Sequence, residues 1–422
     1  MKVKITPSKV GGSISIPSSK SMAHRAIICA SLAKGISKVS NITYSKDIDA
    51  TISCMESLGA KIQKFDTYCI VEGTNLEGTE NITCNCNESG STLRFLIPIA
   101  SLTNQKVTFL GQGRLLSRPM SVYQNIFDEQ NLTFNQSSEN IQIEGSLRAQ
   151  EYKIPGDISS QFITGLLFTL PLLKKDSTIV ISEPFESKSY VNLTIQMLEK
   201  FGIQIEETSS HSYFIKGNQE YKVQDVTVEG DYSQMAFFGV LASLQESLTC
   251  TNMDPHSKQG DMAILDQIKK AGAILNINQD SIEVQHHSLT GQTIDLSNCP
   301  DLGPILCVLA AYSKGCTHII NAGRLRIKES DRIEAMETEL KKWGVEISST
   351  EDSITIVGKE SYENDSMVEI FGHNDHRIVM AMCVFGLCAK SECIIDDAQA
   401  ITKSYPTFFK DIQSIGGKVE QL

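Results

Sequence analysis

The arginines of this chain are few and clustered. Nine occur in 422 residues, and eight of them lie in five short segments: Arg25; Arg94; Arg114 and Arg118; Arg324, Arg326 and Arg332; Arg377. A guanidinium group binds carboxylate or phosphate through two parallel hydrogen bonds. The net charge of −12 argues against a nucleic-acid surface, which needs a basic face. The pattern therefore predicts a protein that binds small anions.

A lysine stands at an unfavourable place in the segment 17–25. We predict Lys20 in the first turn of a helix, where a positive charge opposes the helix dipole. Ser21 and Arg25 are four residues apart and share a face of that helix. No glycine precedes Lys20, which excludes a Walker-type phosphate loop. A solvated helix start could explain the segment, but the position of Lys20 favours a functional site.

Serines open two further predicted helices. Ser89 and Gly90 precede one of them, and Gly90 lets a ligand approach the backbone closely. Ser159, Ser160 and Gln161 open an apolar helix that continues to residue 173. Helix capping explains each of these motifs equally well when it is taken alone. Neither motif identifies a site by itself.

Two carboxylates are candidates for proton transfer. Five of the seven residues 326–332 are charged, and we predict that Ser330 caps the helix that follows, which leaves Glu329 in the loop. Asp301 lies at another predicted helix start, where a plain first-turn carboxylate is the simpler interpretation. Residues 374–377 put three polar groups at the mouth of an apolar helix, where they need partners.

An internal repeat organises the elements that must position these residues. A glycine, or Asn131 in one case, is followed three residues later by an apolar residue in six places: Gly59, Asn131, Gly202, Gly272, Gly344 and Gly416. The spacing is about 70 residues, a period typical of repeated structural units. Each of these residues suits the C-terminus of an amphipathic helix. A strand hairpin is expected after each one.

A second series of helices repeats in register with the first. Six mostly apolar helices are predicted to begin near Ser19, Ser89, Ser159, Asp231, Asp301 and Asp375. A helix that is apolar on nearly all faces is buried. We therefore predict an α/β fold of two similar lobes, each with three units, buried helices inside and sheets outside. The helix N-termini of each lobe would then converge into an anion site.

Other classes of protein fit the sequence poorly. The twelve cysteines include no Cys-x-x-Cys pair and lie mostly in apolar runs, as expected for reduced core residues and not for a metal site. No apolar run is long enough to span a bilayer, and the N-terminus lacks the apolar core of a signal peptide. We expect a cytoplasmic, monomeric protein with no metal, no nucleic-acid partner and no membrane contact.

Together these motifs resemble the 5-enolpyruvylshikimate-3-phosphate synthase family along the whole chain. The segments that carry the resemblance are Ser19-Lys20-Ser21 with Arg25, Ser89–Arg94, Ser159-Ser160-Gln161, Arg326–Arg332 and Asn374–Arg377. The resemblance implies an inside-out α/β barrel in each lobe, built of βαβαββ units. It implies an N-terminal lobe of residues 14–228 and a C-terminal lobe of residues 1–13 plus 229–422. Hinges are expected near 13–17 and 226–230, with closure on substrate binding.

The family reaction transfers the enolpyruvyl group of phosphoenolpyruvate to the 5-hydroxyl of shikimate 3-phosphate, in aromatic amino acid biosynthesis, with no cofactor. Catalysis is expected at Asp301 (base at the hydroxyl), Glu329 (acid at the methylene carbon) and Lys20. Shikimate 3-phosphate is expected at Lys20, Ser21, Arg25, Ser159, Ser160, Gln161, Ser187, Tyr190, Asp301 and Lys328. Phosphoenolpyruvate is expected at Lys20, Gly90, Arg118, Gln161, Arg332, His376, Arg377 and Lys403.

Two alternatives stay open. The sister transferase that acts on UDP-N-acetylglucosamine shares the fold, but it typically has Lys-Asn at the position of Lys20-Ser21 and a reactive cysteine in the loop equivalent to 111–118. A non-catalytic anion-binding module would need the cations without both Asp301 and Glu329. Both comparisons favour the transferase of shikimate 3-phosphate.

Overall fold

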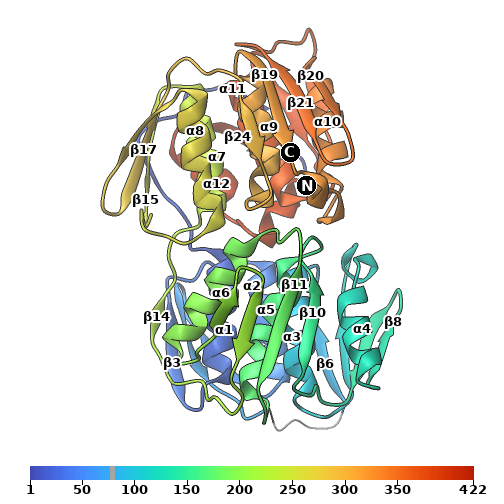
Figure 1. Cartoon of the computed structure of the whole chain (residues 1–422). Coiled ribbons are helices and arrows are strands. Elements are labelled where there is room, and N and C mark those ends of the chain that lie inside the picture. The colour runs from blue at the N-terminus through green and yellow to red at the C-terminus, as the bar shows by residue number, and fades with distance from the viewer. Residues whose placement is uncertain (77–80) are drawn as a thin grey trace. The chain divides into compact units, whose positions relative to one another are not determined.

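The chain forms two compact units. The computed structural model describes residues 1–76 and 81–422 (Figure 1). The C-terminal unit consists of Met1–Ser18 and Glu229–Leu422, and the N-terminal unit of Ser19–Val228. The first boundary lies a few residues later than the expected one, because β2 (Ser13–Ser15) pairs with β15 (Ser247–Thr251) of the C-terminal unit.

Each unit contains three four-stranded sheets among the described residues. In the N-terminal unit their strand orders are β14 (Val226–Thr227), β3 (Ile36–Ser40), β5 (Tyr68–Glu72), β4 (Lys61–Lys64); β6 (Ile82–Asn85), β7 (Val107–Leu110), β9 (Asn140–Glu144), β8 (Thr133–Gln136); and β10 (Glu151–Pro155), β11 (Ser177–Ser182), β13 (Ser212–Ile215), β12 (Glu206–Ser209). In the C-terminal unit they are β2, β15, β17 (Ser281–Gln285), β16 (Ile274–Ile277); β18 (Thr293–Asp295), β19 (Gly315–Ile320), β21 (Ile354–Gly358), β20 (Glu346–Ser349); and β22 (Val368–Ile370), β23 (Cys393–Ile395), β1 (Val3–Thr6), β24 (Lys418–Gln421).

All six sheets follow one pattern of pairing. The first strand is parallel to the second, and the remaining neighbours are antiparallel. Three strands reach their sheets from distant parts of the chain: β14 joins β3, β2 joins β15, and β1 inserts between β23 and β24. The repeat read from the sequence is therefore a repeat of sheet topology, completed at these three places by strands from other parts of the chain.

Buried helices begin where the sequence predicts them. They are α1 (Lys20–Leu32), α3 (Gly90–Ser101), α5 (Ser160–Thr169), α7 (Tyr232–Leu244), α9 (Gly303–Ala311) and α11 (His376–Cys388). Ser19, Ser89, Ser159, Asp231 and Asp375 are the N-caps of five of them, and each cap side chain accepts a hydrogen bond from the first turn. Asp301 differs, because it lies in a short 3-10 turn, Pro300–Leu302, ahead of α9.

The amphipathic helices end as expected. They are α2 (Lys46–Ser57), α4 (Ser121–Glu129), α6 (Lys188–Lys200), α8 (Ala263–Ala271), α10 (Arg332–Lys341) and α12 (Phe408–Ser414). The six repeat positions that follow them, five glycines and Asn131, all have positive φ, which suits a residue that closes a helix. The predicted C-terminal signals are confirmed.

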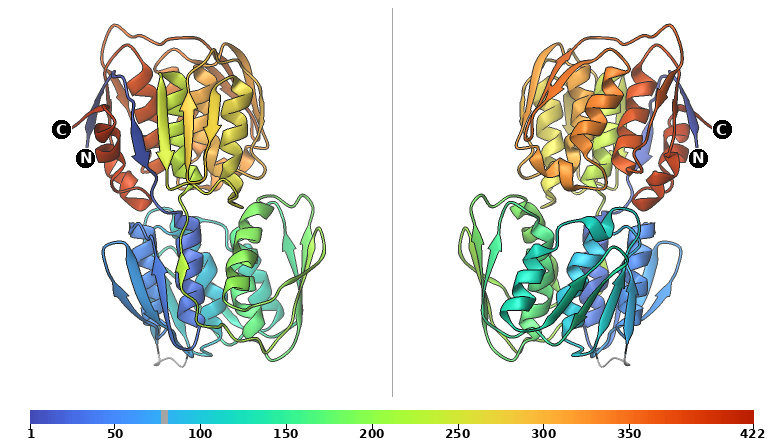
Figure 2. Two further views of the ribbon diagram at one scale, coloured as in Figure 1. Left: turned by 90° about the vertical axis from the view of Figure 1, so that its left-hand side faces the viewer. Right: turned by 90° about the vertical axis from the view of Figure 1, so that its right-hand side faces the viewer.

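Each unit has its own apolar core. The buried helices pack inside the unit and the sheets lie around them, as the views in Figure 2 show. In the C-terminal unit α7, α9 and α11 contact one another, and in the N-terminal unit α3 packs on α5. The predicted α/β fold with helices inside and sheets outside is confirmed. No helix of residues 1–76 and 81–422 is long and apolar enough to cross a membrane.

Candidate active site

The predicted site residues fall into two groups, one in each unit. The N-terminal cluster consists of Lys20, Ser21, Arg25, Gly90, Arg118, Ser159, Ser160, Gln161, Ser187 and Tyr190, with Arg94 added from the structure. The C-terminal cluster consists of Asp301, Lys328, Glu329, Arg332, His376, Arg377 and Lys403, with Asp375 added from the structure. Each cluster is described within its own unit.

The start of α1 holds two cations by different means. Lys20 forms an ion pair of 2.8 Å with Asp47 in the first turn of α2, and both side chains are largely buried. Arg25 is buried and donates to Thr194 Oγ1 at 2.9 Å and to the backbone oxygens of Ser21 and Tyr190 at 2.7 and 2.9 Å. Burial lowers the pKa of Arg25 to about 10. These three acceptors are neutral oxygens, so none of them cancels the charge of Arg25.

Gly90 opens α3 against two guanidinium groups. A Cβ atom at this position would lie 2.7 Å from Arg118 Nη1 and 3.4 Å from Arg94 Nη1, so no side chain fits without displacing Arg118. Arg94 Nη1 donates to Gln161 Oε1 at 2.7 Å, and Gln161 Nε2 donates to Ser91 Oγ at 3.0 Å. The Gln161 amide is thus fixed in orientation between α3 and α5. Within the described residues the buried Nε of Arg118 has no hydrogen-bond partner.

The serine motif at α5 consists of a capping serine and a second, buried serine. Ser159 Oγ accepts a hydrogen bond from the backbone N–H of Gln161 at 3.3 Å, which is the cap that the simpler interpretation predicted. Ser160 is the first helical residue and is 5% exposed. Ser187 precedes α6 in a left-handed conformation with φ of 54°. Tyr190, in the first turn of α6, contributes its carbonyl to Arg25. Arg25 thus ties the start of α6 to α1.

Asp301 lies among three cations. Its carboxylate is 3.2 Å from Lys328 Nζ, 3.2 Å from Arg332 Nη1 and 3.1 Å from Arg377 Nη2. Burial alone would raise the pKa of Asp301, but Arg377, Lys328 and Arg332 together hold it well below its usual range. Burial and the neighbouring cations Arg324 and Arg332 lower the pKa of Lys328, against the attraction of Asp301. The Asp301 carboxylate is therefore ionised, and the three cations around it balance its negative charge.

Arg332 is the centre of the C-terminal cluster and is 1% exposed. Its Nη2 donates to Glu329 Oε2 at 2.6 Å and its Nε to Asp375 Oδ2 at 2.9 Å, in addition to the contact with Asp301. Burial would lower the pKa of Arg332, but Asp375, Glu329 and Asp301 outweigh it and raise the pKa. One guanidinium therefore joins three carboxylates from three segments of the chain.

The prediction that Ser330 caps α10 is wrong. Asp331 is the N-cap, because its Oδ1 accepts from the backbone N–H groups of Ile333 and Glu334. Ser330 instead donates to Asp375 Oδ2 at 3.0 Å. Lys328 and Glu329 still precede the helix, as expected, and the shift of one residue directs the serine hydroxyl towards the start of α11.

Arg377 connects the starts of three buried helices in the C-terminal unit. From α11 it donates to Ser233 Oγ of α7 at 3.0 Å and to Asp301, ahead of α9, through both its side-chain carboxylate and its backbone oxygen. His376 is buried beside it. Lys403 is also buried and donates to the backbone oxygen of Asn374 at 2.6 Å. The three helix starts of this unit therefore converge, as the repeat predicts.

Sequence reasoning missed Asp47 and Ser233, which contact these clusters, and it gave Arg94 and Asp375 no role at the site although both lie in the motifs. A lysine placed against a helix dipole needs a nearby anion, which is a signal that could have pointed to Asp47. The N-cap position of Asp375 was visible, but its contact with Arg332 joins segments 43 residues apart, so pattern reasoning could not find it. Arg94 and Ser233 act through contacts between different repeats.

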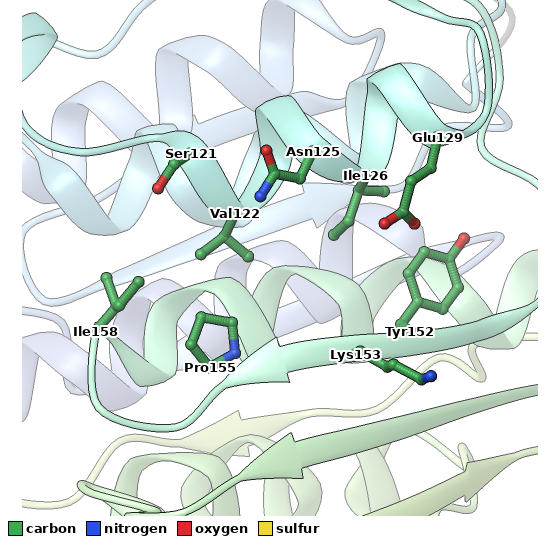
Figure 3. Close-up of a pocket in the computed structure, with 9 residues that line it drawn as sticks. All are labelled: Ser121, Val122, Asn125, Ile126, Glu129, Tyr152, Lys153, Pro155 and Ile158. Carbon is green, nitrogen blue, oxygen red and sulfur yellow. The ribbon is translucent and has the colours of Figure 1, made fainter.

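A cavity in the N-terminal unit has none of the predicted site residues in its lining. It has a volume of about 150 Å³ and lies between α4 and β10 (Figure 3). Its lining consists of Ser121, Val122, Asn125, Ile126, Glu129, Tyr152, Lys153, Pro155 and Ile158. Across residues 1–76 and 81–422, no group of three or more histidine, cysteine or acidic residues is arranged to hold a metal ion.

Solved structures share this fold. An EPSP synthase from Acinetobacter baumannii superposes with a TM-score of 0.82 at 24% identity, with 100% of both chains covered. The enolpyruvyl transferase NikO from Streptomyces tendae superposes with a TM-score of 0.81 at 13% identity, covering 99% of this chain and 98% of NikO. The fold is therefore that of the enolpyruvyl transferases.

Sequence comparison narrows the class to one family. The family model of EPSP synthase (3-phosphoshikimate 1-carboxyvinyltransferase) matches residues 5–412. Relatives named 3-phosphoshikimate 1-carboxyvinyltransferase include one from Clostridium perfringens, 48% identical over 99% of this chain and 98% of its own, and one from Clostridium kluyveri, 44% identical with the same coverage. The chain belongs to the EPSP synthase family, which confirms the predicted resemblance.

Proposed function

We propose that this protein transfers the enolpyruvyl group of phosphoenolpyruvate to the 5-hydroxyl of shikimate 3-phosphate and releases phosphate, as a 3-phosphoshikimate 1-carboxyvinyltransferase of the shikimate pathway. Family membership over nearly the whole chain supports this activity. The structural observation that carries it is the Arg332 guanidinium, which joins Glu329 and Asp301. These are the two carboxylates that an addition–elimination reaction requires beside cations for anionic substrates.

The reaction needs two proton transfers in each half. In the addition, Glu329 gives a proton to the methylene carbon of phosphoenolpyruvate, and the 5-hydroxyl attacks the neighbouring carbon while Asp301 takes the hydroxyl proton. In the elimination, the carboxylate of Glu329 removes a proton from the new methyl group as the carbon–oxygen bond to phosphate breaks, and the proton that Asp301 took in the addition passes to the leaving phosphate. The oxygen of the leaving phosphate is stabilised by cations, for which we propose Lys20, Arg118 and Lys403.

Substrate binding can release the carboxylates for this chemistry. Arg332 and Arg377 are the residues proposed for the carboxylate of phosphoenolpyruvate, and without substrate they hold Asp301. A carboxylate that loses a cation partner becomes a better proton acceptor. The carboxylate of phosphoenolpyruvate would therefore raise the basicity of Asp301 by competing for these two arginines. The same competition would free Glu329 from Arg332 to carry a proton.

Shikimate 3-phosphate is assigned mainly to the N-terminal cluster. Ser160, Ser187 and Lys328 suit its phosphate, with Ser159 partly engaged as a helix cap. Arg25 and Ser21 suit its carboxylate, and Tyr190 its ring. Support comes from Arg25, because it donates to neutral oxygens that leave its charge available to an anion. Gln161 and Gly90, held beside Arg94 and Arg118, suit phosphoenolpyruvate. His376 is also proposed for phosphoenolpyruvate, because it lies beside Arg377 in the chain.

Phosphate release tests the activity against its nearest alternative. Purified protein should release phosphate from phosphoenolpyruvate only when shikimate 3-phosphate is present, and a chelator should leave the rate unchanged. Equal activity with UDP-N-acetylglucosamine would favour the sister transferase. Binding of both substrates without phosphate release would favour a non-catalytic anion-binding module. Loss of activity with the chelator would contradict the metal-free mechanism.

The cellular compartment, the oligomeric state and the closure of the lobes are proposed on less direct observations. All twelve cysteines are free thiols, most of them buried, which supports a reducing compartment such as the cytoplasm. A monomeric state and closure of the lobes on shikimate 3-phosphate stay predictions from the sequence. Sedimentation and small-angle scattering, each with and without substrate, would measure them.

A further inference from the structure

The turn that leads into α11 has an unusual backbone. His373 and Asn374 are consecutive residues in the left-handed region, with φ of 52° and 49°. Residues other than glycine adopt this region at a conformational cost and keep it only where surrounding contacts hold it. Directly after these two residues come Asp375, His376 and Arg377, so whatever holds the turn also places the start of α11.

Glu339 of α10 holds this turn from outside the proposed site. Its side chain is 1% exposed. One carboxylate oxygen accepts from His373 Nε2 at 3.0 Å, and the other accepts from the backbone N–H of Phe371 at 3.1 Å and from Lys342 Nζ at 2.7 Å. His373, Lys342 and the N–H group of Phe371 hold the pKa of Glu339 below its usual range against the opposing effect of burial. The Glu339 carboxylate thus accepts hydrogen bonds from both ends of the segment 371–373.

The far side of the same turn contacts proposed substrate-binding residues. The backbone oxygen of Asn374 accepts from Lys403 Nζ at 2.6 Å. The carboxylate of Asp375 accepts from Arg332 Nε at 2.9 Å. A continuous series of contacts therefore runs from Glu339 through His373 and the turn to Lys403 and Arg332. The cations at its end are those proposed for phosphoenolpyruvate.

A purely structural role is the competing explanation, because a buried carboxylate needs partners wherever it lies. Lys342 and the N–H of Phe371 already supply two. The hydrogen bond from His373 is a third contact, which the buried carboxylate of Glu339 does not need in order to be satisfied. It attaches the carboxylate to the first of the two left-handed residues, at the point where the chain turns towards Lys403.

We propose that Glu339 is a positioning residue that, through His373, sets the place of Lys403 and Arg332 and thereby the affinity for phosphoenolpyruvate. This inference rests on the proposed function, since it assigns an effect to one of the two substrates. It differs from a general effect on folding, because shikimate 3-phosphate is assigned mainly to the other cluster.

Steady-state kinetics with each substrate varied in turn tests this assignment. Glu339→Met keeps the length of the side chain and removes every acceptor, so KM for phosphoenolpyruvate should rise about tenfold, the loss expected for one or two ordinary hydrogen bonds. KM for shikimate 3-phosphate should change less than about twofold. Glu339→Gln keeps an amide that can still bond to Phe371 and His373, and it should restore most of the affinity.

Two further variants separate the contact from the fold. His373→Asn keeps a residue that tolerates the left-handed region but is too short to reach Glu339. It should raise KM for phosphoenolpyruvate as Glu339→Met does, and the double variant should be no worse than Glu339→Met, because each single variant already removes the contact between these two side chains. Glu337→Met is the matched control, since Glu337 on the same helix pairs with Lys341 at 2.6 Å. It should leave both KM values unchanged.

The outcomes are distinct. If the wild-type protein releases no phosphate with both substrates, the proposed function is wrong. If the wild type is active and His373→Asn leaves KM for phosphoenolpyruvate unchanged, the positioning role is wrong even where Glu339→Met fails to fold. Equal rises in both KM values, or additive effects in the double variant, would likewise overturn it and leave Glu339 a structural residue.

Discussion

The two clusters of this chain contain similar cations but bind them in opposite ways. In the N-terminal cluster Arg25 donates to hydroxyl and backbone oxygens, all of them neutral, and Arg94 donates to the amide oxygen of Gln161. In the C-terminal cluster Arg332 and Arg377 donate to the carboxylates of Asp301, Glu329 and Asp375, and Lys328 does the same. Arg25 is thus oriented with its charge left in place, whereas Arg332 and Arg377 are neutralised by carboxylates.

The difference suggests that the N-terminal cluster mainly binds anions and that the C-terminal cluster also supplies groups for proton transfer. Within the N-terminal unit Lys20 forms an ion pair with Asp47, and a second acid, Glu88, lies against Gly113. Four cations of the C-terminal cluster are matched by three carboxylates. A cation held by neutral dipoles attracts an anion without first breaking an ion pair. Where a cation is paired with a carboxylate, a substrate anion that binds the cation displaces the carboxylate. The displaced carboxylate is then available for proton transfer.

The largest expected effect comes from the carboxylates. Glu329→Gln and Asp301→Asn should each lower kcat by roughly two to four powers of ten, the usual contribution of a positioned proton-transfer group. Both amides keep the shape of the side chain, and KM for each substrate should change much less. Phosphate-release kinetics measure both constants. Near-normal turnover in either variant would remove that residue from the mechanism and weaken the contrast between the clusters.

A smaller loss is expected at the start of α5. Ser160→Ala should weaken binding of shikimate 3-phosphate by about 1.5–3 kcal/mol, the value of a hydrogen bond to a charged group. Ser159→Ala is a less direct test, because that hydroxyl also caps the helix and its loss costs about 1 kcal/mol of stability. Titration calorimetry and thermal unfolding of both variants separate the two effects. Unchanged affinity in Ser160→Ala would reject this phosphate site.

Gly90→Ala should act on the other substrate. The added methyl group would overlap Arg118 Nη1 at 2.7 Å and force that guanidinium to move, while the neutral partners of Arg25 stay in place. Since small displacements of positioning groups are costly, KM for phosphoenolpyruvate should rise about tenfold. Affinity for shikimate 3-phosphate should be nearly unchanged. A variant with normal kinetics would show that Arg118 has room to shift without loss.

The smallest effect concerns stability at acid pH. Burial raises the pKa of Asp375, but Arg332 outweighs it and depresses the pKa in the folded protein. A depressed pKa contributes stability above the unfolded pKa of about 4, and this contribution is lost as pH falls through the folded value. Asp375→Asn should therefore unfold at a lower temperature than wild type at pH 7, and the gap should narrow below about pH 4. A gap that widens in acid would contradict the assignment.

Local signals predicted much of this molecule because they act over a few residues. Gly344 needs a left-handed backbone wherever the rest of the chain lies, and Ser89 caps a helix through its own first turn. The error at Ser330 shows the limit, since Ser330 and Asp331 are both good caps and only the contact with Asp375 decides between them. Contacts such as Arg377 to Ser233 join different repeats, so no periodicity encodes them. The motifs predicted the candidate site residues, and only the fold shows which of their charges are paired.

Calorimetric titration of shikimate 3-phosphate, without phosphoenolpyruvate, tests the contrast between the clusters most directly. Arg25→Gln and Arg377→Gln each remove one buried guanidinium, the first from neutral partners and the second from Asp301. With folding checked by thermal unfolding, Arg25→Gln should weaken binding by at least about tenfold, the loss of one charged hydrogen bond. Arg377→Gln should change it by less than about threefold, because its charge is already neutralised. An equal or larger loss in Arg377→Gln would contradict the proposed division between the two clusters.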